Sequence, residues 1–191
     1  MKKHLLRFPL LLSAALLILS SCEKDNDDHN HEEHEEEVIT TLQLTFAPVG
    51  GGNTVTYKYD DPDGPGGNNP TKDQIVLAPN KTYNVSLQLL NKTVNPAVDI
   101  TEEVEEEGEA HRFYYTPSAN SNITIANLNN DANGVALGTT SQWTTTGSGT
   151  GTVRITLRHY AGNPPNKAAN DPVNSPKSAT DIEVDFNTSI Q

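Results

Sequence analysis

The feature that most constrains the fold is an alternation of apolar and polar residues with a period of two. Successive side chains of a β-strand point to opposite faces, so this alternation predicts strands that are buried on one face only. Five segments show it clearly: 42–46, 55–59, 83–89, 153–158 and 181–186. Four further segments show it more weakly: 74–78, 112–115, 122–128 and 139–145.

The segments between the expected strands are rich in Gly, Pro, Asn and Asp, which favour turns. They are 48–53, 60–73, 129–138 and 161–180. Seven to nine short strands separated by such turns predict an all-β fold, an antiparallel, immunoglobulin-like β-sandwich. Segment 99–110 is the single candidate for a short helix, although Gly108 weakens it.

The first 21 residues have the layout of an export signal. Lys2, Lys3 and Arg7 give a positive start, and an apolar run at 8–19 precedes two serines. The apolar run is shorter than the roughly 20 residues that a membrane-spanning helix needs. We therefore expect residues 1–21 to be a signal peptide.

The sequence Leu19-Ser20-Ser21-Cys22 resembles the lipobox of bacterial lipoproteins, in which the cysteine receives acyl chains such as palmitate. Cys22 is the only cysteine, which excludes an intrachain disulfide. The acidic run after it resembles export signals of Bacteroidota surface lipoproteins. These likenesses imply an outer-membrane lipoprotein anchored through Cys22, with surface display favoured over a periplasmic position. The alternative is a secretory signal with an incidental cysteine.

The net charge of −12 is concentrated rather than spread along the chain. Residues 23–37 hold nine acidic residues and three histidines, with no apolar residue. Such a segment buries too little surface to offset its ordering entropy, which predicts a tether at 22–37 before a sandwich domain at 38–191. The acidic balance also argues against nucleic acid as a partner, since phosphates require a basic face.

The tether contains the residues best suited to hold a metal ion. His29, His31 and His34 stand among Glu32, Glu33, Glu35 and Glu36. Imidazole combined with carboxylate suits divalent ions such as Zn²⁺, Cu²⁺ or Ni²⁺. The alternative is a solvated spacer, because a His-rich tract is only a compositional indication of metal binding.

A second candidate metal locus pairs Glu107 with His111, which would lie one turn apart on a helix. The alternative is an exposed acidic helix or loop, with His111 beginning the buried face of a strand that continues at Phe113. His159 continues the apolar face of residues 153–157 and is interpreted as a cap on the core.

Two loops have features of calcium sites, at 60–64 and 129–134. In the second, Thr140 stands where a calcium loop would place a bidentate Glu, so turn chemistry explains both loops and calcium is the less favoured ion. Trp143 suits either the core or a platform for stacking sugars. The sequence contains no nucleophile elbow, phosphate loop or dinucleotide fingerprint, and we expect no enzymatic activity.

Six segments together resemble a family of small, uncharacterised Bacteroidota lipoproteins: 35–42, 60–64, 89–91, 99–103, 143–145 and 153–159. Members often carry the label "type 1 periplasmic binding fold superfamily protein". That label denotes a two-lobed α/β fold, whereas the residue pattern here predicts an all-β sandwich. The family is similar to accessory lipoproteins of TonB-dependent outer-membrane transporters, which implies such a transporter as a partner.

These observations lead to one functional hypothesis and one rival. The hypothesis is a non-enzymatic envelope lipoprotein that captures divalent metal ions or assists an outer-membrane uptake system. The rival is a structural or adhesive surface module that binds protein or glycan through its loops and Trp143.

Overall fold

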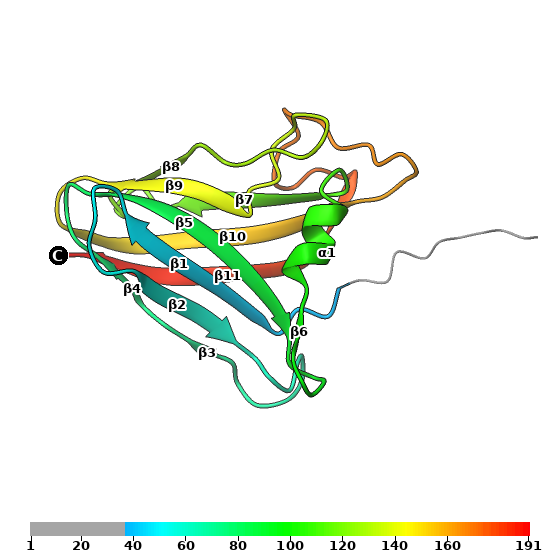
Figure 1. The fold of residues 1–191 in the computed structure, drawn as a ribbon, viewed down its shortest axis with the longest axis horizontal. Coiled ribbons are helices and arrows are strands. Elements are labelled where there is room, and N and C mark those ends of the chain that lie inside the picture. The colour runs from blue at the N-terminus through cyan, green and yellow to red at the C-terminus, as the bar shows by residue number, and fades with distance from the viewer. Residues whose placement is uncertain (1–36) are drawn as a thin grey trace, which may run out of the picture. The chain divides into compact units, whose positions relative to one another are not determined.

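The alternating segments of the sequence become strands of two facing β-sheets. The computed structural model describes residues 37–191, and Figure 1 shows the two sheets stacked over a shared interior. The predicted signal peptide, Cys22 and the metal-ligand candidates between His29 and Glu36 lie outside the described residues. No helix within 37–191 has the length and apolarity needed to cross a bilayer.

The first sheet, sheet A, has seven strands in the order β3-β2-β1-β5-β9-β8, with β6 paired to β5. Its strands are β1 (Thr41–Pro48), β2 (Val55–Asp60), β3 (Thr71–Lys72), β5 (Thr82–Asn91), β6 (Val98–Asp99), β8 (Ile123–Ala126) and β9 (Thr140–Thr145). Every strand pair in it is antiparallel.

The second sheet, sheet B, has four strands in the order β4-β11-β10-β7. They are β4 (Ile75–Leu77), β7 (His111–Pro117), β10 (Gly149–Tyr160) and β11 (Ser178–Ile190). Only β4 runs parallel to its neighbour, β11. The all-β sandwich is therefore confirmed. The two-residue strands β3 and β6 raise the strand number above the predicted nine, because a pair of residues carries no detectable alternation.

The core lies between the sheets and consists of the apolar side of each alternating strand. From sheet A it takes Leu42, Leu44, Phe46, Val85, Leu87, Leu89 and Trp143; from sheet B it takes Phe113, Val153, Ile155, Leu157, Val184 and Phe186. Trp143 is fully buried, and its ring meets that of Phe46 edge-on at 5.1 Å. The core interpretation of Trp143 is thus correct, and this residue offers no surface for stacking a sugar.

The expected helix is present but shorter than the 99–110 segment. Helix α1 spans Thr101–Glu106, and Val104 is its only buried residue. One buried side chain among several glutamates gives little packing energy to extend a helix. The chain therefore turns after Glu107 and enters β7 at His111.

The long loop between β10 and β11 is fastened to the sandwich. Lys167, whose side chain is only 2% exposed, forms an ion pair with Asp131 at 2.6 Å and donates a hydrogen bond to the carbonyl of His111. Arg112 donates to the carbonyls of Ala168 and Ala169. These contacts hold the loop near the start of β7 and the end of β10, the end of the molecule that also carries α1 (Figure 1).

Candidate metal site

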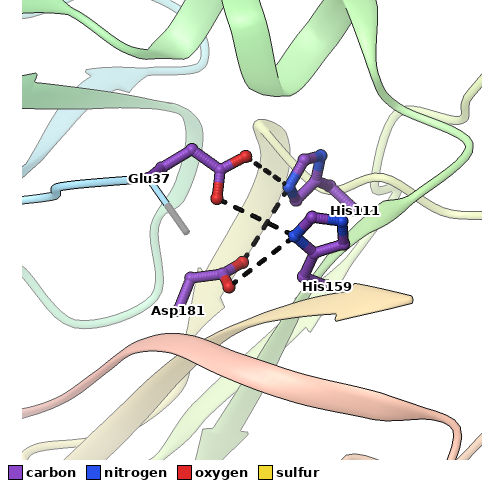
Figure 2. A group of neighbouring side chains, drawn as sticks. All are labelled: Glu37, His111, His159 and Asp181. Carbon is purple, nitrogen blue, oxygen red and sulfur yellow. Dashed lines mark ion pairs between the residues drawn. The ribbon is translucent and has the colours of Figure 1, made fainter. Parts of the chain in front are cut away.

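Four ionisable side chains converge at the α1 end of the sandwich. They are Glu37, His111, His159 and Asp181, and Figure 2 shows the two carboxylates facing the two imidazoles. Their side chains are between 0% and 8% exposed. Burying so many ionisable groups is costly unless they are paired or coordinate a metal, so the cluster requires an explanation.

Strand pairing brings the two histidines together. His111 begins β7, His159 lies near the end of β10, and the antiparallel register places them directly opposite each other. Both continue the inward faces of their strands, beside Phe113 and Leu157. The centroids of the two rings lie 4.6 Å apart, which places both imidazoles in one buried space.

A β-bulge brings Asp181 into the same space. Leu157 pairs with Ile182, whereas Arg158 pairs with Thr180, so Asp181 is the extra residue of β11. By strict alternation Asp181 would point outward with Glu183 and Asp185, as the sequence pattern predicts. The bulge shifts the phase, and its side chain is only 1% exposed. Bulges commonly redirect a side chain in this way beside functional sites.

Glu37 arrives from outside sheet B. It precedes Thr40, whose backbone N–H donates to the carbonyl of Leu90 in sheet A. The sequence assigns Glu37 to the end of the tether, but its side chain is 4% exposed and lies against the histidines (Figure 2). The cluster therefore joins the segment that leads into β1 with three strands of the opposite sheet.

The distances between these groups are close to those between ligands of a single ion. His111 Nε2 lies 2.8 Å from Glu37 Oε1 and 3.9 Å from Asp181 Oδ2. His159 Nδ1 lies 3.9 Å from Glu37 Oε2 and 4.0 Å from Asp181 Oδ1. Tetrahedral ligands at ~2.0–2.2 Å from a zinc ion lie ~3.3–3.6 Å from one another. Small adjustments of four side chains would place all of them at bonding distance.

Without an ion, the charges of the cluster partly offset one another. Burial alone would raise the pKa of Glu37, but its hydrogen bond with His111 and that residue's charge hold the pKa below its ordinary value. Burial alone would lower the pKa of His111, but Glu37, assisted by Asp181, raises it. A proton on His111 thus offsets part of the buried negative charge, and a metal cation would take over that role.

The orientation of His111 is set by a second contact. Its Nδ1 lies 3.1 Å from the main-chain carbonyl of Glu107. In the neutral imidazole this carbonyl holds the proton on Nδ1, which leaves the Nε2 lone pair directed at the cluster. The sequence predicts the Glu107 carboxylate beside His111. The structure instead brings its carbonyl there, and the Glu107 side chain is exposed.

The two calcium-like loops use their carboxylates in other ways. Asp131 pairs with Lys167 and accepts backbone N–H groups from Asn133 and Val135. Asp60 pairs with Lys92 at 2.6 Å. Asp63 accepts hydrogen bonds from the backbone N–H and the side-chain amide of Asn68. Turn hydrogen bonds, with ion pairs at Asp60 and Asp131, are therefore the better interpretation of both loops.

Sequence reasoning therefore identified one of the four clustered residues as a ligand candidate. It placed His159 in the core, Asp181 on the outer face and Glu37 in the tether. The usable signal was that His111 and His159 each end an apolar face. The Asp181 bulge has no evident signature in the residue pattern.

Comparison with known proteins adds no relative to this description. No family model matches the chain, and no curated protein or solved structure shows significant similarity to it.

Proposed function

We propose that this protein binds one divalent transition-metal ion through Glu37, His111, His159 and Asp181, as a non-enzymatic lipoprotein of the cell envelope. The observation that carries the proposal is the convergence of four buried donor atoms, all within 4.8 Å of one another, from four separate segments. Folding brings these segments together, so the site belongs to the tertiary structure rather than to a local acidic run.

The donor set supports a borderline metal. Two imidazoles and two carboxylates suit Zn²⁺ best, with Cu²⁺ and Ni²⁺ as further candidates. Ca²⁺ prefers six to eight oxygen ligands and is the weaker candidate. Two carboxylates with two neutral imidazoles also carry a charge of about −2, which a divalent cation neutralises.

The arrangement favours holding an ion over catalysis. Four protein ligands complete a tetrahedral shell, whereas catalytic zinc sites keep one position for water or substrate. The predicted anchor at Cys22 and the resemblance to accessory lipoproteins support a proposed role in metal capture for an outer-membrane, TonB-dependent transporter. The histidines of the tether would then provide a first, weaker binding segment.

Calorimetry with Zn²⁺ tests the buried site. The full chain, purified in detergent, is compared with two variants. The tether variant carries His29→Ala, His31→Ala and His34→Ala, and the core variant carries His111→Ala and His159→Ala. We expect the tether variant to keep one tight site per chain and the core variant to lose it.

The reverse result would overturn the proposal. If the core variant, checked for folding by circular dichroism, kept the tight site while the tether variant lost it, binding would belong to the tether. Asp185→Asn provides a matched control for Asp181→Asn, because Asp185 lies on the same strand with its side chain 45% exposed. Only the Asp181 change should weaken binding.

A further inference from the structure

The four ligands of the proposed site differ in how firmly the fold holds them. His111, His159 and Asp181 lie on β7, β10 and β11, which are adjacent strands of sheet B. His111 and His159 are paired with each other in the β7–β10 ladder, and Asp181 lies between two residues of β11, Thr180 and Ile182, that are paired with β10. These residues form a two-histidine, one-carboxylate face fixed by the sheet.

Glu37 is held less firmly than the other three ligands. Within residues 37–191, backbone hydrogen bonding of the N-terminal segment begins at Thr40. Val38 is 50% exposed, and Ile39 is partly buried against the core. The segment 37–39 is therefore held by the packing of Ile39 and by the contacts of the Glu37 carboxylate.

A buried ion can exchange with solvent only if some element around it moves. Displacing β7 or β11 would break the ladder that this strand forms with β10, and displacing β10 would break both ladders. Moving residues 37–39 breaks no strand ladder and exposes the other three ligands at once. Local opening of this kind follows the segment with the fewest buried contacts and backbone hydrogen bonds.

We propose that Glu37 is the exchangeable ligand of the site: the ion enters and leaves when residues 37–39 detach, and a bound ion fastens this segment to sheet B. This inference rests on the proposed metal binding and adds its regulation. It also couples metal occupancy to the chain that immediately precedes the domain, which contains the predicted tether. An occupied site would fix the point at which that chain leaves the domain.

The rate of metal release tests the inference without changing any ligand. The probe is Co²⁺, whose visible absorption reports its coordination, loaded into the tether variant and removed by excess EDTA in a stopped-flow instrument. Ile39→Ala loosens the segment, and Val38→Ala is the matched control at an exposed neighbour. Loss of packing at a partly buried isoleucine should speed release by about tenfold, while the control stays within about twofold.

Ile39→Val gives a milder change if Ile39→Ala perturbs folding, and its release rate should lie between wild type and Ile39→Ala. Amide hydrogen exchange should also show metal-dependent protection at residues 38–40. Equal release rates for Ile39→Ala, Ile39→Val and Val38→Ala would overturn the inference while leaving metal binding intact. If the unmodified site took up no Co²⁺ or Zn²⁺, the proposed function itself would fail, and this inference with it.

Discussion

Asp181→Asn should remove most of the stabilisation that zinc gives to the folded domain. A ligand that binds only the native state stabilises it by an amount set by its concentration relative to Kd. All four proposed ligands come from segments that only the folded chain brings together, so the unfolded chain offers no equivalent site. Replacing the Asp181 carboxylate by a neutral amide leaves a much weaker oxygen ligand and removes one of the two negative charges in the cluster.

The expected magnitude follows from mass action. At zinc concentrations 1,000 times Kd, the native state gains about 4 kcal/mol. Loss of one ligand should weaken affinity by about a hundredfold, which leaves the variant at about ten times its own Kd and a gain of about 1.4 kcal/mol. For a domain of this size, 1 kcal/mol corresponds to about 2–4 °C in Tm. The zinc-induced rise in Tm should therefore be about 8–16 °C for the reference chain and about 3–6 °C for the variant.

The assay is thermal unfolding followed by circular dichroism, with zinc and with EDTA. The tether variant serves as the reference chain, so that only the buried site contributes. Asp185→Asn in the same background should show the full zinc-induced rise. An Asp181→Asn protein with the same rise as the reference would show that this carboxylate does not bind the ion, and the reasoning would be refuted.

Three further predictions concern other parts of the molecule. Zinc affinity measured by calorimetry should fall as pH decreases, because protons compete with the metal for the histidines. The pKa of His111 is raised, so the decline should begin above the ordinary histidine pKa of about 6.5. A constant Kd between pH 8 and 5.5 would contradict this. Trp143→Ala should cost about 3–5 kcal/mol in urea unfolding, since the ring is fully buried, and a change below 1 kcal/mol would be inconsistent with the core described. Burial alone would raise the pKa of Asp131, but Lys167 holds that pKa below its ordinary value. The ionised carboxylate therefore stabilises the fold fully above its unfolded pKa of about 3.9, and this stabilisation is lost as pH falls through the lower folded pKa. The difference in unfolding free energy between the wild-type protein and Asp131→Asn should shrink over that pH range, and a difference that grows would contradict the pairing.

The comparison of sequence and structure is most instructive at β11. Alternation alone correctly places Val184 and Phe186 in the core and Asp185 outside it, where it pairs with Arg154 at 2.8 Å. The same rule fails at Asp181, because Asp181 is the extra residue of a bulge and its side chain turns into the buried cluster. A bulge is decided by the pairing of two strands, and a pattern within one strand does not contain that information.

The histidines also show that the residue pattern predicts which face a side chain occupies but not which residue lies opposite it. The sequence places His111 and His159 at the ends of apolar faces, which is where the structure has them. That they lie opposite each other depends on the register of β7 and β10, which are separated in the chain by β8 and β9 of the other sheet. Proximity between such strands is a property of the fold.

The sequence by itself determined the fold class, because a period of two is a local property that each strand carries within its own residues. It also supplied the predictions that rest on short contiguous segments, such as the signal peptide, the lipidation of Cys22 and the His-rich tether. The candidate metal site was decided only by tertiary structure. Strand register, one bulge and the path of the chain into β1 bring Glu37, His111, His159 and Asp181 together, and none of these is a property of a single segment.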